Sequence, residues 1–198
     1  MIKENGILLQ VKRIDLQLLK ENPEKFWGGV EEIGSYAFTD SWVEELVVPN
    51  TVKKLGARAF YSCKYLKTIA LPQSVSQISH HCFQWCWSLE KVLLPDSIRE
   101  IDDYAFGGCE KLEGIVLPEG IVHIGNNAFE HCHNLTKIYL PASVKKADSN
   151  LFSHCGRLKE VYALGNTKFT QASFKGMKAG AKIYIREQNL EELNAELN

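Results

Sequence analysis

Residues 63–83 read CKYLKTIALPQSVSQISHHCF, and this arrangement returns along the chain at a fixed interval of 23 residues. Two residue types mark the interval. Prolines stand at positions 49, 72, 95, 118 and 141, and cysteines at positions 63, 86, 109, 132 and 155. Self-similarity at a fixed period of roughly 20–50 residues indicates a solenoid, in which each repeat forms one turn and contacts only its neighbours.

Within one repeat, the apolar spacing predicts a strand, a turn and a return segment. Ile69 and Leu71 alternate with Ala70, which is the two-residue period of a strand. Pro72 ends the strand because it has no N–H to donate to a neighbouring strand. The segment that ends at Ile78 returns the chain along the opposite face and can form a short second strand. Since every turn runs the same way, neighbouring strands must pair in parallel.

A phenylalanine near the end of each repeat is predicted to point inward. No single repeat can bury its apolar side alone, so these rings should stack as one continuous aromatic column. The column would contain Phe38, Phe60, Phe83, Phe106, Phe129, Phe152 and Phe174.

The pattern C-x-x-L-x-x-I-x-L-P-x-x-V-x-x-I-x-x-x-A-F resembles the BspA-like, or Treponema pallidum-type, leucine-rich repeat. The similarity covers roughly residues 30–185, with departures at Cys82, Ala147, Leu151 and Leu164. It implies a β-rich (α/β) solenoid with six to seven right-handed, parallel-β turns. Many members of this bacterial family are surface or secreted proteins implicated in adhesion and protein binding. The resemblance therefore implies a binding scaffold and not an enzyme.

The solenoid at 30–185 is predicted to carry a cap at each end, because open strand edges would otherwise recruit other chains. In the N-terminal cap, residues 1–29, a strand is expected at 7–11. A short helix should follow and end at Asn22-Pro23, and Phe26-Trp27 should cover the first turn. Residues 186–198 are predicted to form a C-terminal helical cap, because leucines recur there at helical spacing.

Composition excludes several classes of protein. The net charge of −1 argues against nucleic acid or an anionic membrane as the partner. The sequence contains no run of 18 apolar residues and no signal-peptide pattern at its start. The chain as given is therefore expected in the cytoplasm. Members of the family that it resembles are, however, often surface or secreted proteins. Five of the six cysteines share one repeat position, so we expect a ladder of reduced, buried thiols and not disulfides.

The outward positions of the strands form the main candidate binding surface. One position per strand lacks charge and strong polarity, and charged residues such as Lys91 and Lys137 flank this stripe. An apolar stripe is a candidate protein interface, although such residues also simply suit exposed strands. The stripe consists of Val47, Ala70, Leu93, Val116, Tyr139 and Tyr162.

The turn edge before the strands holds a second cluster. Trp85 and Trp87 flank a cysteine there and form a candidate contact patch for a carbohydrate or a cell surface. In-register stacking would place His131 and His154 side by side, where they could hold zinc or copper with Glu130. An ordinary solvated turn edge is the favoured interpretation, because these three ligands fall short of a complete structural set. We therefore predict no metal and no cofactor.

No catalytic constellation emerges from the sequence. The carboxylates Asp102, Asp103 and Asp148 are predicted to cap turns, and no nucleophile with a base and an orienting group is present. The leading prediction is a non-catalytic scaffold that binds another protein through the concave face of the sheet. The alternative is a carbohydrate- or cell-surface-binding module that uses the aromatic turn edge. Self-association through the same stripe is also open.

Overall fold

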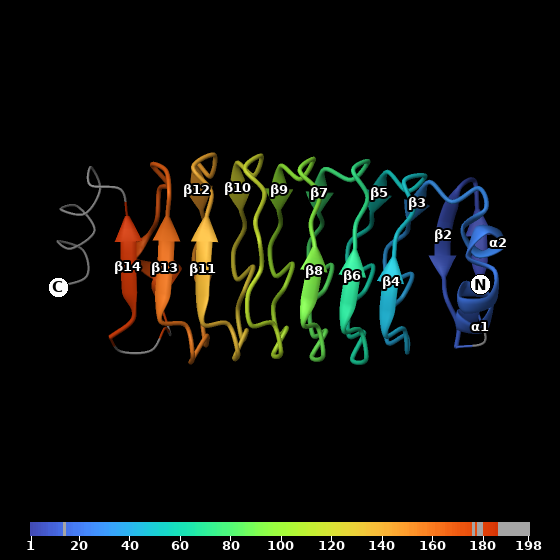
Figure 1. The fold of residues 1–198 in the computed structure, drawn as a ribbon, viewed down its shortest axis with the longest axis horizontal. Coiled ribbons are helices and arrows are strands. Elements are labelled where there is room, and N and C mark those ends of the chain that lie inside the picture. Colours follow the sequence, from blue (N-terminus) through green and yellow to red (C-terminus); the bar gives the residue numbers. More distant parts are fainter. Residues whose placement is uncertain (14, 176, 178–179, 186–198) are drawn as a thin grey trace.

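Each 23-residue repeat becomes one turn of a parallel β-solenoid in the computed structural model, which describes residues 1–13, 15–175, 177 and 180–185. The turns stand side by side from an N-terminal cap to the last strand, β14 (Figure 1). The predicted fold class is therefore confirmed. Two layers of strands, one on each side of the stack, enclose the apolar core.

The longer strands lie on one side, which we call the long-strand face. Strands β4 (Glu45–Val47), β6 (Thr68–Ala70) and β8 (Lys91–Leu93) form one parallel sheet. Strands β11 (Lys137–Leu140), β13 (Glu160–Ala163) and β14 (Lys182–Ile185) form another. Equivalent repeat positions pair directly, so the outward side chains of successive turns stand in rows.

The opposite side carries the predicted second strands, each two residues long. They are β3 (Glu32–Ile33), β5 (Lys54–Leu55), β7 (Gln77–Ile78), β9 (Glu100–Ile101), β10 (His123–Ile124) and β12 (Lys146–Ala147). The last four form a continuous parallel sheet. The second residue of each strand is buried in the core, whereas the first lies on the outer surface. We call this side the short-strand face.

The sheet on the long-strand face is interrupted at the third cysteine-bearing repeat, which corrects the prediction of an unbroken row of paired strands. Residues 113–117 occupy the strand position, yet they form no strand. Among the described residues, no backbone hydrogen bond involves any residue from Gly114 to Leu117. Gly114 weakens strand pairing because it has no side chain to pack and loses more conformational freedom on ordering. The face is therefore divided between β8 and β11.

The aromatic column is the centre of the core. Six phenylalanines, from Phe38 to Phe152, stack with centroid distances of 4.9, 5.2, 5.4, 5.5 and 6.1 Å. All six are fully buried. The prediction of Phe174 as a seventh member was wrong. Its ring packs on that of Phe169, with the ring centroids 4.9 Å apart. It belongs to the irregular last repeat, where a 3₁₀ helix (Gln171–Phe174) replaces the regular turn.

A second buried ladder consists of the five repeated cysteines. The thiol of each cysteine donates a hydrogen bond to the carbonyl oxygen of a phenylalanine in the preceding turn, as Cys109 does to Phe83 at 3.3 Å. All five are free and completely buried, as predicted. Burial raises the pKa of the Cys109 thiol far above its usual range. The Cys109 thiol therefore stays protonated and serves as a hydrogen-bond donor between turns without being reactive.

Two positions in each turn adopt left-handed backbone conformations, a feature that the sequence reasoning missed. Arg58 and His81 represent one row, while Ser62 and Trp85 represent the other, and their φ angles lie between 55° and 62°. Such angles are uncommon for residues other than glycine. Each of these residues donates its N–H to a carbonyl oxygen in the following turn, as Trp85 does to Gly107 at 2.8 Å. These inter-turn bonds hold the strained conformation in place.

The N-terminal cap contains β1 (Ile2–Glu4), β2 (Ile7–Gln10), α1 (Asp15–Glu21) and α2 (Pro23–Trp27). Strand β2 pairs in parallel with β3 and so continues the short-strand face. Asn22 and Pro23 end the first helix, as predicted, but they also begin a second helix that was not foreseen. The ring centroids of Phe26 and Phe38 are 6.3 Å apart, so Phe26 covers the first turn. The predicted helical cap at 186–198 lies outside the described residues.

Candidate functional site

A groove of about 550 Å³ lies where the long-strand face is interrupted. Its walls come from β8, from residues 113–118 and from the start of β11. Five of the predicted site residues line it: Lys91, Leu93, Val116, Lys137 and Tyr139. The stripe therefore becomes a recess at its centre, which the sequence pattern could not show because the pattern is the same in every repeat.

The remaining stripe residues lie outside the groove on either side. Val47 stands at the N-terminal end of the face and is 74% exposed, and Ala70 stands between it and the groove. Tyr162 lies on the C-terminal side, where it pairs across the strands with Tyr139. Val116, inside the groove, is 84% exposed. The stripe thus remains uncovered over most of its length.

Three tyrosines form a stack beside the groove. The rings of Tyr139 and Tyr162 are 4.7 Å apart, and those of Tyr162 and Tyr184 are 4.6 Å apart with nearly parallel planes. The sequence reasoning missed Tyr184, because the last repeat has lost its cysteine and its proline. The alternation Ile183-Tyr184 was the available signal. Stacked rings have little rotamer freedom left to lose, so this surface is preorganised for contact.

Charges of alternating sign accompany the tyrosine stack. Lys137 is opposite Glu160, which in turn is opposite Lys182. The ammonium group of Lys137 lies 5.4 Å from the ring centre of Tyr139. The neighbouring Tyr139 and Glu160 raise the pKa of Lys137, so this cation persists at neutral pH. The apolar surface is therefore bordered by a polar rim.

On the turn edge, the structure separates the two candidate tryptophans. Trp85 is half-buried and lies across Gly108, reaching toward the His131 ring at 5.9 Å. Gly108 makes room for this arrangement, because a Cβ there would collide with the Trp85 ring. Trp87 is exposed and faces the ammonium group of Lys64 at 4.9 Å. The two rings therefore have different neighbours and do not act as one patch.

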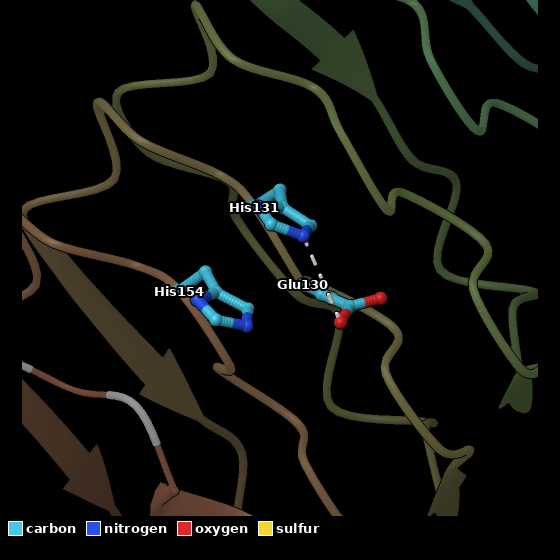
Figure 2. A group of neighbouring side chains, drawn as sticks. All are labelled: Glu130, His131 and His154. Atoms are coloured by element: carbon cyan, nitrogen blue, oxygen red, sulfur yellow. Dashed lines mark ion pairs between the residues drawn. The ribbon is translucent and has the colours of Figure 1, made fainter.

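His131 and His154 lie side by side, as the repeat register predicted. Their rings stack at 4.4 Å with planes 7° apart. The Glu130 carboxylate lies 3.9 Å from His131 Nε2 (Figure 2). Burial lowers the pKa of His131, Glu130 opposes this effect, and the neighbouring His154 and His133 add to the lowering.

A further charged cluster lies on the short-strand face, where His123 bridges two carboxylates. Its Nδ1 is 3.1 Å from Glu100 and its Nε2 is 2.9 Å from Asp148. Asp148 also pairs with Lys146, and among the described residues no backbone N–H donates to its carboxylate, so it does not cap a turn as predicted. The Asp103 carboxylate accepts the backbone N–H of Asn126, the equivalent residue one full repeat later, so it links two neighbouring turns. The cluster was missed because the outward residues of the short second strands were not compared between turns.

We expect the His123 cluster to stabilise the fold in a defined pH window. Burial alone would lower the pKa of His123, but Asp148 and Glu100 together outweigh it and raise that pKa. Burial also disfavours the ionised Asp148, yet Lys146 and His123 outweigh it and lower the Asp148 pKa. The His123 contribution is therefore complete below the unfolded value of about 6.5 and disappears as the pH rises through the folded pKa. The Asp148 contribution requires a pH above about 3.9, its unfolded value, and is lost as the pH falls through its folded pKa.

Urea unfolding of wild type and His123→Gln tests this expectation at about pH 5.5 and about pH 9, which lie on either side of the unfolded histidine pKa. The difference in unfolding free energy should be larger at the lower pH. In a Glu100→Gln/Asp148→Asn background, only burial acts on the His123 pKa, so the difference should no longer be larger at the lower pH. A pH-independent effect in the wild-type background would contradict the assignment.

A family model described as the BspA type leucine-rich repeat region matches residues 31–159 and 76–196 in six copies. These ranges cover most of the chain. The chain belongs to the BspA-type leucine-rich repeat family. Leucine-rich repeat solenoids are commonly protein-interaction modules and typically non-enzymatic, and BspA-type members are often surface proteins. No curated protein matches the chain.

Solved BspA-type and related solenoids support the assignment. A leucine-rich repeat protein of T. pallidum is 35% identical to this chain, with a TM-score of 0.63. The match covers 67% of this chain and 63% of the T. pallidum chain. One from Bacteroides ovatus is 36% identical over 68% of this chain and 35% of its own, with a TM-score of 0.62. The pneumococcal vaccine antigen PcpA shares the fold, at 21% identity over 84% of this chain and 42% of its own, with a TM-score of 0.69.

This BspA-type chain spans less than two thirds of the length of each of these three solved chains. Within the described residues, no helix combines the length and the apolar character needed to cross a bilayer.

Proposed function

We infer that this chain is a non-catalytic binding module that holds another protein in the groove on its long-strand face. The observation that carries this proposal is the convergence of Leu93, Val116 and Tyr139 on one groove of about 550 Å³. Leaving large apolar side chains in water is unfavourable, at roughly 25 cal/mol per Å² of apolar surface, so covering them favours association.

The backbone at the groove supports an extended partner segment. Residues 114–117 make no backbone hydrogen bonds within the described chain, and Gly114 and Val116 are exposed. An extended peptide can pair its own N–H and C=O groups with such free backbone groups while its side chains enter the recess. Lys91 and Lys137 flank the recess and suit carboxylates or carbonyl oxygens at its rim.

The tyrosine stack extends the surface toward the C-terminal end. Tyrosine is enriched among residues that dominate binding energy, because it offers a large rigid area and a polar tip. Tyr139 joins the stack to the groove, since it belongs to both. We therefore expect Tyr139 to be the central anchor of the interface and Tyr162 to support it.

A photo-crosslinking amino acid at Val116 tests the proposal directly. Incubated with lysate of the source organism, it should form a covalent adduct with a partner protein. The matched control carries the same group at Val122, which is exposed on the other side of the molecule, next to β10. Adding Tyr139→Glu/Tyr162→Glu should reduce the Val116 adduct at least tenfold, because losing hot-spot residues costs about 2 kcal/mol or more.

Equal adducts from Val116 and Val122, or an adduct that survives both glutamates, would overturn the proposal. Unchanged urea unfolding of the glutamate variant is required, so that loss of capture reflects the surface. An adduct with the mass of two copies of this chain would instead show self-association.

A carbohydrate- or cell-surface-binding function has one observation in its favour. Trp42 and Tyr65, both exposed, lie 5.2 Å apart on the turn edge, and Trp87 is exposed on the same edge. Aromatic rings on an exposed edge suit stacking against sugars. A glycan array with wild type and Trp87→Ala separates this function from the first, because binding through the groove does not involve Trp87.

A further inference from the structure

Glu130, His131 and His154 bring three metal-ligating groups together outside the groove. One ligand atom from each lies within 4.8 Å of the other two. Figure 2 shows His131 and His154 on neighbouring turns, each with a ring nitrogen directed toward the side where the Glu130 carboxylate lies. Apart from the loose pair between Glu130 and His131 at 3.9 Å, none of these side chains has a charged partner among the described residues.

The repeat fixes the two imidazoles in the same orientation. His131 and His154 occupy equivalent positions in successive turns, with φ angles of 55° and 60°. The N–H of His131 donates to the Ser153 carbonyl oxygen at 2.8 Å, which ties one turn to the next beside the cluster. Because both backbones have the same unusual conformation, both side chains leave the chain in the same direction.

Neighbouring aromatic groups support this arrangement. Trp85 contacts His131 at 5.9 Å, and His133 meets the same ring edge-on at 5.5 Å. His133 Nδ1 also donates to the carbonyl oxygen of His154 at 3.1 Å. Contacts around ligating side chains orient them and strengthen metal binding.

We propose that Glu130, His131 and His154 bind a divalent transition-metal ion of the zinc or copper class. Two imidazole nitrogens and one carboxylate suit these ions, whereas calcium and magnesium prefer oxygen ligands. Metal–ligand bonds of about 2.0–2.2 Å in a tetrahedral site place ligand atoms about 3.4 Å apart. The parallel stack points the two ring nitrogens in nearly the same direction, so His154, which is exposed, must rotate out of the stack before both nitrogens and the half-buried Glu130 carboxylate can reach one ion.

Three protein ligands leave a coordination position open. The sequence expectation of no metal rested on the absence of a complete four-ligand structural set, but sites with three protein ligands hold the metal and keep water at the fourth position. The site carries one negative charge from Glu130, which offsets part of the charge of the ion.

Isothermal titration of the full, untagged chain with Zn²⁺ at neutral pH tests the proposal. Wild type should bind one ion per chain, and His154→Ala and Glu130→Gln should each bind it at least tenfold more weakly. His80→Ala is the matched control, because His80 is 60% exposed and follows β7 at a distance from the cluster. Cu²⁺ should bind more tightly than Zn²⁺ at the same site. Affinity should fall as the pH is lowered, because protons compete with the ion for the imidazole nitrogens.

Zinc binding that is equally strong in wild type, His154→Ala and Glu130→Gln would overturn the site, as would no zinc binding by wild type. An equal loss in His80→Ala would show adventitious binding to surface histidines and would also overturn it. The isosteric Glu130→Gln keeps the test independent of any effect of His154→Ala on folding. Urea midpoints of all variants without metal should agree with that of wild type.

Discussion

Replacing Phe106 with alanine should lower the free energy of unfolding by about 3–5 kcal/mol, the usual cost of removing a buried phenylalanine side chain. Phe106 is completely buried and stacks on Phe83 at 5.4 Å and on Phe129 at 5.5 Å. Each turn of a solenoid is stabilised mainly by its neighbours, so a gap in the middle of the column weakens two interfaces at once. Urea denaturation followed by circular dichroism measures the loss.

Phe174→Ala provides the matched control for this prediction. Phe174 is also largely buried, but it lies outside the column and contacts Phe169 in the irregular last turn. The loss should be smaller, because only one end of the stack is affected. Equal losses for the two variants would show that the column has no special part in stability.

The sequence was sufficient to predict the column because its spacing is strictly periodic. Each inward phenylalanine recurs with the same neighbours, and every level of the pattern favours the same turn. The prediction was wrong only at Phe174, where periodicity itself ends. There, Leu164 replaces the proline of the earlier repeats, and local contacts with Phe169 decide the packing.

The groove could not be predicted, because it depends on how residues 113–117 pair with both neighbours. Ile115 and Leu117 satisfy the repeat pattern as well as Val92 and Leu94 of the preceding repeat do. Only Gly114 differs, and glycine is tolerated in many strands. The sequence therefore identified the residues of the candidate interface, while the structure shows which five of them share one recess.

Contacts between turns were predictable only where the repeat register is sufficient. The register placed His131 beside His154, and the structure confirms it. The His123 cluster also depends on register, since Glu100 and His123 are equivalent residues of paired strands. It was missed because the short second strand was uncertain from sequence, so that its outward residues were not compared between turns.

Leu164 illustrates how a departure from the pattern acquires a structural role. It occupies the position at which the earlier repeats have proline. Unlike proline, it has a backbone N–H, which donates to the Leu140 carbonyl oxygen at 3.0 Å. This bond extends the pairing of β11 with β13 beyond the point at which proline would end it. The tyrosine stack lies on these longer strands.

Cys109→Asp should destabilise the fold by several kcal/mol at neutral pH, which is the effective cost of burying an unpaired charge. Cys109 is completely buried, and its thiol donates to the Phe83 carbonyl oxygen at 3.3 Å. An ionised carboxylate cannot donate this bond, and its negative charge would repel the partially negative Phe83 carbonyl oxygen. Burial should raise the pKa of the introduced carboxyl group in the folded state. The folded chain then holds its proton more tightly, so the destabilisation should grow as the pH rises above about 3.9, the unfolded value.

Cys109→Ser separates the effect of charge from the effect of removing sulfur. A serine hydroxyl can donate the same bond, and Ser41 already occupies the equivalent position in an earlier turn, where it lies 3.5 Å from the Cys63 sulfur. We expect Cys109→Ser to cost about 1–2 kcal/mol, with little change between acid and neutral pH. Urea unfolding of both variants at two pH values measures the comparison. Equal stability of the aspartate and serine variants at neutral pH would contradict this prediction. Water would then have to reach the cysteine ladder, and the ladder would not be the dry contact between turns that its burial indicates.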